Sequence, residues 1–290
     1  MSGALVARLA GNRLHLQHGP IDIVAQAFGP KAAVAAAEAR AAARFGTVLE
    51  ELAAELPALR AEDAPVTGAI AQRMTAAVSP FRAEFITPMA AVAGAVADEI
   101  LAVLAGPGVS RAYANNGGDI ALHLAPGQML TCALAVTGGL DSVAVRAEDR
   151  VRGIATSGWR GRSFSLGIAD AVTVLARSAA IADAAATMIA NAVDLPGHTG
   201  IARRPAQEMQ SDSDLGARLV TMGVAPLTAA ERDAALAAGL RAAEGFRARG
   251  LIEGAALFLQ GGRMATGAIA LPVGESADVR FQYPQDRHPG

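Results

Sequence analysis

The chain has 290 residues, of which 52% are apolar and only 4% aromatic, so its core is expected to consist mainly of alanine, valine, leucine and isoleucine. A net charge of −2 gives no basic surface for nucleic acid or an anionic membrane. The single cysteine, Cys132, excludes an intrachain disulfide and a cysteine-rich metal site, and it is expected to pack inside an apolar strand.

The first part of the chain predicts a small antiparallel meander followed by three helices. Residues 1–28 alternate short apolar runs with turn residues. Gly29-Pro30 then places a proline at the start of a long alanine-rich helix over 31–56. Two more helices are predicted over 66–78 and 89–104. The latter is too short to span a bilayer and no signal-peptide pattern is present, so a cytoplasmic location is expected.

From Arg111 onward the pattern changes to short β-like runs separated by glycine and aspartate turns. Strands are predicted over 112–115, 120–124, 129–136, 142–146, 150–156 and 171–175. A helix is predicted over 178–193, followed by a polar, proline-containing loop over 194–215. The remaining elements are expected to be a strand, a helix, two strands and a frayed tail, over 218–225, 229–249, 254–260, 264–271 and the last dozen residues.

This order of elements favours an α+β fold. Helices come in blocks and do not alternate one-for-one with strands, as they would in a doubly wound parallel sheet. The length fits a single domain over 1–290 or two intimately packed halves of about 1–110 and 111–290. The alanine-rich helices leave room for a homo-oligomer.

The turn Asn115–Asp119 is the first candidate for a ligand contact. Gly117 and Gly118 let backbone amides approach a phosphate or a ring edge closely. The alternative interpretation is a tight hairpin turn, because Asn-Gly is among the commonest hairpin signals. Taken alone, the segment favours the turn.

The second candidate follows an apolar strand and combines hydroxyl, indole and guanidinium groups in Thr156, Ser157, Gly158, Trp159, Arg160 and Arg162. Arginine matches a phosphate as a bidentate fork, and tryptophan offers a stacking face. These residues therefore suit an anionic, aromatic ligand. The alternative is that Trp159 is a packing anchor.

The third candidate is a polar stripe on an otherwise apolar helix, formed by Asp183, Thr187 and Asn191 at i, i+4 and i+8. A carboxylate and a hydroxyl one turn apart supply hard oxygen ligands suited to Mg²⁺. A solvated helix face is the alternative. None of the five histidines forms a metal-binding or catalytic-triad pattern.

Taken in order, these segments resemble the ApbE family of FAD-dependent FMN transferases. Asn115–Asp119 is similar to the family's Asn-x-Gly-Gly-Asn/Asp segment, and 155–158 to its Thr-Ser-Gly segment. Asp183 and Thr187 match its Ala-Asp-x-x-x-Thr helix. The resemblance implies an ApbE-like, T-fold-like architecture, with Mg²⁺ on Asp183 and Thr187. It also implies FAD or FMN at Asn116, Gly117, Gly118, Asp119, Thr156, Ser157, Gly158, Arg160 and Arg162.

Two departures point to a divergent branch of that family. The Gly-x-x-Lys-Gly-x-x-x-Asp segment appears as Ala90–Asp98, with Gly94 and Asp98 kept but Ala93 in the place of the lysine. The His-x-x-Asp-Pro-x-Thr-Gly loop is missing from the shortened interval 160–170. In the family these parts hold the flavin nucleotide.

Three functional hypotheses follow. The first is a nucleotide- or flavin-binding protein in which Mg²⁺ supports FMN-transferase-like cleavage of a phosphoanhydride. The second is a non-catalytic protein that uses the same cleft to bind a small ligand or to act as a scaffold. The third is an enzyme acting on another cofactor or its precursor, with Arg160, Arg162 and Arg203 as anion clamps.

Overall fold

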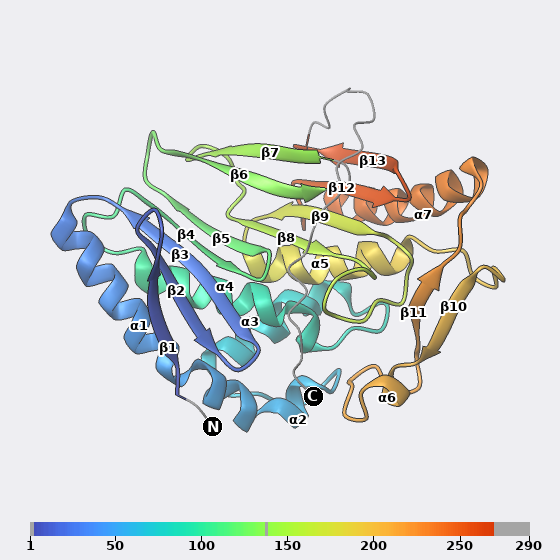
Figure 1. The fold of residues 1–290 in the computed structure, drawn as a ribbon, viewed down its shortest axis with the longest axis horizontal. Coiled ribbons are helices and arrows are strands. Elements are labelled where there is room, and N and C mark those ends of the chain that lie inside the picture. The colour runs from blue at the N-terminus through green and yellow to red at the C-terminus, as the bar shows by residue number, and fades with distance from the viewer. Residues whose placement is uncertain (1–2, 137–138, 270–290) are drawn as a thin grey trace.

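A computed structural model describes residues 3–136 and 139–269 (Figure 1). One nine-stranded sheet organises the chain, and every neighbouring pair of strands in it is antiparallel. In spatial order its strands are β1 (Leu5–Leu9), β2 (Arg13–His18), β3 (Ile21–Phe28), β4 (Arg111–Asn116), β5 (Asp119–Leu124), β8 (Gly153–Ser157), β9 (Ala171–Ala176), β12 (Gly254–Leu259) and β13 (Gly262–Gly267). The predicted meander forms one end of this sheet.

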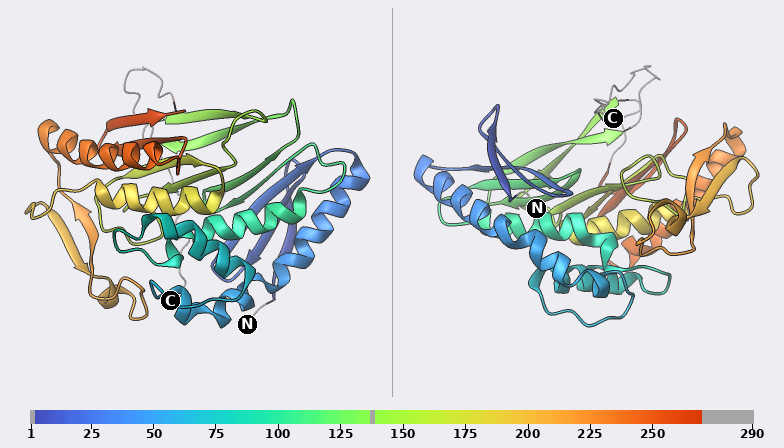
Figure 2. Two further views of the ribbon diagram at one scale, coloured as in Figure 1. Left: turned by 180° about the vertical axis from the view of Figure 1, so that it is seen from behind. Right: turned by 60° about the horizontal axis from the view of Figure 1, so that its bottom comes forward.

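The long helices lie together on one face of the sheet (Figure 2). They are α1 (Lys31–Ala54), α3 (Ala69–Val78), α4 (Val92–Leu104), α5 (Ala179–Ala192) and α7 (Ala229–Ala248). Shorter turns join them: α2 (Leu56–Leu59), η1 (Ser79–Phe81) and η2 (Pro88–Ala91). No helix in the described ranges is long and apolar enough to cross a membrane. The mixture of grouped helices and an antiparallel sheet confirms the α+β prediction.

Side-chain alternation along the strands builds the core between the sheet and the helices. In β3, Ile21, Ile23, Ala25 and Ala27 are buried against α1 and α4, while the residues between them face the other side. The helices contribute mostly alanine, and α5 alone buries seven alanines among its nine buried residues. Small side chains on both surfaces allow the helices to approach the sheet closely.

A hairpin covers part of the opposite face of the sheet. Its strands, β6 (Met129–Val136) and β7 (Gly139–Arg146), pair only with each other among the described residues. Cys132 and Val145 pack from this hairpin against Leu122 and Leu124. The cysteine is buried as expected, and burial raises the pKa of its thiol to about 11, so it stays protonated at neutral pH.

The prediction of a loop over 194–215 is wrong, because this segment contains β10 (Ile201–Pro205) and α6 (Ala206–Met209). The strand β10 pairs with β11 (Leu219–Val224) in a separate two-stranded sheet (Figure 1). The partner lies beyond α6, so local composition gave no signal of the pairing. Of the two arginines in this strand, Arg204 is exposed and Arg203 is partly buried. The predicted frayed tail lies outside the described residues.

Candidate functional site

The residues of the Asn-Gly-Gly-Asp turn and of α5 meet on the helix-covered side of the sheet. Asp119 opens β5 and is only 7% exposed. Its carboxyl lies within hydrogen-bonding range of the carboxyl of Asp183, which is half-buried in the second turn of α5. We call these two side chains the carboxylate pair. The fold thus brings together two predicted site residues that are far apart in the sequence.

The start of α4 orients the carboxylate pair. The backbone N–H of Gly94 donates a 3.0 Å hydrogen bond to Oδ2 of Asp183. The Asn116 side chain, which is 5% exposed, donates through Nδ2 to the carbonyl oxygen of Ala93 at 3.1 Å. On the other side, the Thr156 N–H donates to Oδ1 of Asp119 at 3.3 Å. Backbone groups therefore fix both carboxyls in place.

Burial raises the pKa of both acids, and repulsion from Asp119 raises that of Asp183 further. Desolvation is the main cause at Asp119 and raises its pKa to about 7, although the Thr156 amide and the Asp183 carboxyl lower it in part. Desolvation also raises the pKa of Asp183 well above its usual value, and the charge of Asp119 adds to the effect. Two carboxyls this close share a proton at mildly acidic pH unless a cation lies beside them.

The donor set at the pair fits Mg²⁺. Thr187 lies one helical turn beyond Asp183 on α5 and is half-buried. Among the described residues no group of three or more histidine, cysteine, aspartate or glutamate side chains could hold a metal. A cation here would therefore have two carboxylates, with hydroxyl, carbonyl or water oxygens completing its shell. Mg²⁺ commonly binds in this way, because it gives up its waters reluctantly.

The third residue of the polar stripe has a structural contact. Oδ1 of Asn191 accepts hydrogen bonds from the Leu166 N–H at 3.0 Å and from the Ser165 hydroxyl at 3.4 Å. It therefore holds the loop that precedes β9. Asp183 in the polar stripe therefore belongs to the carboxylate pair, whereas Asn191 anchors the loop before β9.

Gly117, Gly118 and Arg162 line a hollow of about 290 Å³ together with Asp22, Val24 and Asn115. Asn115 and Asn116 are neighbours in β4 and point to opposite faces, so this hollow lies on the face away from the helices. The Arg162 guanidinium rests directly on Gly117, so a side chain at this position would have to displace it. Gly117 has a φ of +65°, which also favours glycine. The Asn115–Asp119 turn therefore contributes to both faces of the sheet: Asn116 and Asp119 lie on the helix-covered face, and Asn115 lines the hollow on the opposite face.

Thr156, Ser157 and Gly158 end β8 beside this turn. The Thr156 hydroxyl pairs with that of Thr173 on β9 at 2.9 Å, and Ser157 is half-buried. A Cβ at Gly158 would lie 2.5 Å from the carbonyl oxygen of Asp170, so glycine is required there for a close backbone approach. These contacts show that residues 156–158 hold β8 against β9.

Asp170 is a residue that the sequence analysis missed. It is 8% exposed, and its Oδ1 accepts from Trp159 Nε1 at 3.2 Å and from Arg160 Nε at 2.6 Å. Its Oδ2 accepts from the Gln260 N–H at 2.6 Å. The Arg160 guanidinium also lies 4.7 Å from the centre of the Trp159 ring. Arg160 is thus engaged with Asp170, and Trp159 is held as a packing anchor.

Replacing Asp170 by alanine is expected to destabilise the protein by about 2–4 kcal/mol, because it leaves the Trp159 and Gln260 donors unpaired. Thermal denaturation measures the loss, and the emission of Trp159, the only tryptophan, reports the loosened loop. The control Arg160→Ala removes one half-exposed partner and should cost under about 1 kcal/mol. Equal losses in the two variants would contradict this role for Asp170.

Arg203 is also engaged. It forms an ion pair with Asp194 and donates to the carbonyl oxygen of Leu166. Two of the three arginines expected to clamp an anion, Arg160 and Arg203, therefore hold the fold. Arg162 is exposed and has no carboxylate within ion-pairing distance in the described part of the chain.

The two kept residues of the Ala90–Asp98 segment attach α4 to α5. Asp98 accepts from the N–H groups of Ala179 and Ala180, both at 3.0 Å, and so caps the N-terminus of α5. A Cβ at Gly94 would lie 2.5 Å from the Ala179 carbonyl carbon and 2.7 Å from the Ala180 nitrogen. Both residues therefore serve the helix crossing that positions Asp183.

Comparison with known proteins gives archaeal relatives that are named UPF0280 protein. A protein named UPF0280 protein from Methanothrix thermoacetophila is 37% identical over 145 residues, 45% of this chain and 56% of the relative. A UPF0280 protein from Methanopyrus kandleri is 37% identical over 139 residues, 48% of this chain and 54% of the relative. The chain spans about half the length of the curated relatives it matches.

A structural match and a family match extend over most of the chain. The crystal structure of the Pseudomonas stutzeri flavinyl transferase ApbE in its apo form covers 91% of this chain and 93% of that chain, at 14% identity and a TM-score of 0.42. The family described as AbpE bacteria matches residues 6–269 and confirms the predicted ApbE-like kinship. Because that match includes almost every described residue, the chain belongs to the AbpE bacteria family.

Proposed function

We propose that this protein binds Mg²⁺ at the carboxylate pair together with a phosphorylated small ligand of the nucleotide or flavin type. The observation that carries the proposal is the meeting of Asp119 and Asp183, two acids whose pKa values are raised by burial beside one another. A divalent cation would relieve the repulsion between them. Perturbed acids of this kind are concentrated at functional sites.

Each part of the site has a distinct task in this proposal. Asp119 and Asp183 hold the cation, Thr187 offers a hydroxyl one turn away, and the Gly94 N–H keeps the Asp183 carboxylate oriented. Arg162, whose charge acts on Asp119 across the Gly117–Gly118 turn and lowers its pKa, supplies a positive charge for the anionic group of the ligand. Bound Mg²⁺ would supply Lewis-acid polarisation of a phosphoanhydride, the chemistry of FMN-transferase-like cleavage.

A thermal-shift series with FAD, FMN, ATP or no ligand, each with and without Mg²⁺, tests the proposal. Ligand at about 100 times its Kd stabilises the native state by about 2.7 kcal/mol, which raises the Tm of a chain of this size by several degrees. We expect Mg²⁺ to raise the Tm, and a nucleotide to raise it further only when Mg²⁺ is present. A Tm that Mg²⁺ leaves unchanged under every condition would overturn the proposal.

Binding without catalysis is the second candidate, and a specific observation favours it. Ala93 stands where the related transferases have lysine, and Arg160 is tied to Asp170. The protein would then lack cationic groups for transfer chemistry while keeping a hollow at Arg162. This function gives a ligand-induced Tm rise that a chelator leaves unchanged, without any product.

A further inference from the structure

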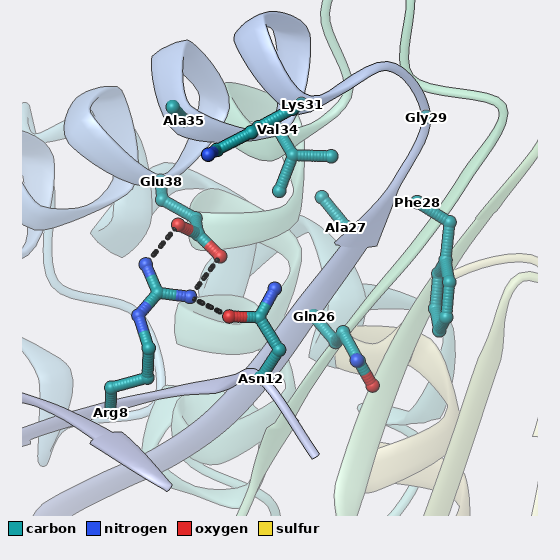
Figure 3. A pocket seen from close by; sticks show the side chains of 10 residues that line it. All are labelled: Arg8, Asn12, Gln26, Ala27, Phe28, Gly29, Lys31, Val34, Ala35 and Glu38. Atoms are coloured by element: carbon teal, nitrogen blue, oxygen red, sulfur yellow. Dashed lines mark hydrogen bonds and ion pairs between the residues drawn. The ribbon is translucent and has the colours of Figure 1, made fainter. Parts of the chain in front are cut away.

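A second hollow, of about 500 Å³, lies between the first hairpin and the start of α1 (Figure 3). It shares no lining residue with the candidate site described above. The hairpin, the end of β3 and one side of α1 line it through Arg8, Asn12, Gln26, Ala27, Phe28, Gly29, Lys31, Val34, Ala35 and Glu38. Its size suits a small organic molecule.

An ion pair between the half-exposed Arg8 and the buried Glu38 forms one wall of this hollow. Glu38 is 7% exposed, and its carboxylate accepts from Arg8 at 3.2 Å through Nη1 and at 2.5 Å through Nη2. Burying a carboxylate is costly unless a partner neutralises it. Arg8 provides that neutralisation and ties the hairpin to α1, and it also donates to Oδ1 of Asn12. The wall is therefore ordered and electrically neutral.

Lys31 gives the hollow a net positive charge. It is the only lysine of the chain, and in the described ranges no carboxylate lies within ion-pairing distance of it. Asn12 uses its oxygen to accept from Arg8, which leaves its amide nitrogen as a donor that points away from Arg8 in Figure 3. One ammonium and one amide donor suit a single anionic group.

The remaining wall is apolar. Ala27, Phe28 and Val34 supply it. The Phe28 ring is fixed by the Arg111 guanidinium, which lies 4.5 Å from the ring centre. In Figure 3 this ring points away from Lys31, whereas Ala27 and Val34 lie beside the lysine, so an apolar body can pack against those two side chains while its charged end reaches Lys31.

We propose that this hollow is a binding site for a small organic monoanion, a carboxylate attached to an apolar body. Charge sets the class, because among the side chains that line the hollow Arg8 and Glu38 cancel and only Lys31 remains to be neutralised. The apolar wall sets the shape of the rest of the ligand. The site is separate from the carboxylate pair, so it stands whether or not the proposed Mg²⁺ function holds.

Titration calorimetry of the full chain with 2-naphthoate, and with the neutral 2-naphthamide as the matched control, tests this site. We expect naphthoate to bind at least about 10-fold more tightly than naphthamide, because a charge-assisted hydrogen bond contributes about 1.5–3 kcal/mol. Lys31→Met should remove that preference, and Lys31→Arg should keep it. Asp183→Asn should leave naphthoate binding unchanged.

A second variant tests the location without touching a charge. Ala35 is exposed and lines the hollow, so Ala35→Trp should fill it while the fold, followed by circular dichroism and Tm, is retained. Naphthoate binding should then fall by at least about 10-fold. Naphthoate binding that persists in both Ala35→Trp and Lys31→Met would overturn the proposal, as would the absence of binding to the unaltered protein at millimolar naphthoate.

Discussion

Replacing Asp183 by asparagine is expected to abolish the rise in Tm that Mg²⁺ produces. The amide has nearly the same shape and its oxygen can still accept from the Gly94 N–H, so the fold keeps that hydrogen bond. It removes one of the two negative charges that would hold the cation. The measurement is Tm as a function of Mg²⁺ concentration in the two proteins.

The same variant should change how stability depends on pH. In the metal-free native state the Asp119 pKa is raised to about 7, above the value of about 3.9 in the unfolded chain. The native state therefore holds an extra proton between these values, and its stability falls as pH rises through this range, by about 1.4 kcal/mol per pH unit for each proton. Mg²⁺ should reduce that fall, because it takes the place of the proton.

Asp183→Asn should flatten this pH dependence and make the metal-free protein more stable than the unaltered one at pH 8, because the like charge is gone. Asp22→Asn is the matched control. Asp22 is an exposed carboxylate that bonds to His15 at the hollow beside Arg162, away from the carboxylate pair, and its loss should leave the Mg²⁺ response unchanged. An Asp183→Asn protein with an intact Mg²⁺ response would show that the pair is not the cation site.

Replacing Gly94 by alanine is expected to cost about 3 kcal/mol of stability, or roughly 6–10 °C in Tm. The added methyl would collide with the Ala179 carbonyl and the Ala180 nitrogen, which are backbone atoms at the start of α5. Because the clashing atoms belong to the backbone, no change of side-chain rotamer can relieve the collision. Because α4 orients Asp183, the variant should also weaken the Mg²⁺ response.

Gly46→Ala is the matched control for this helix substitution. Gly46 lies in the middle of α1, is exposed, and has nothing within 4 Å of the position of an added Cβ. Alanine should therefore stabilise the protein by about 0.5–1 kcal/mol through its higher helix propensity. A Gly94→Ala protein as stable as the Gly46→Ala protein would contradict the close crossing of α4 and α5.

Local chemistry predicted much of the fold. Gly29-Pro30 marked the start of α1 because proline suits a first helical turn, and period-two alternation marked strands such as β3. The block order of helices and strands gave the fold class. The prediction for 194–215 was wrong because the polar and proline residues of β10 are typical of a loop. The strand that pairs with β10 lies further along the chain, so the local composition does not reveal the pairing.

The sequence by itself determined most of the elements, the family and most of the candidate residues, because turn chemistry, periodicity and motif order are properties of neighbouring residues. Only the tertiary structure decided which candidates meet. It joins Asp119 to Asp183 through the packing of α5 on the sheet, ties Arg160 to Asp170, and leaves Arg162 exposed. Strand pairing and helix packing bring these residues into contact, and both depend on residues that are distant in the chain.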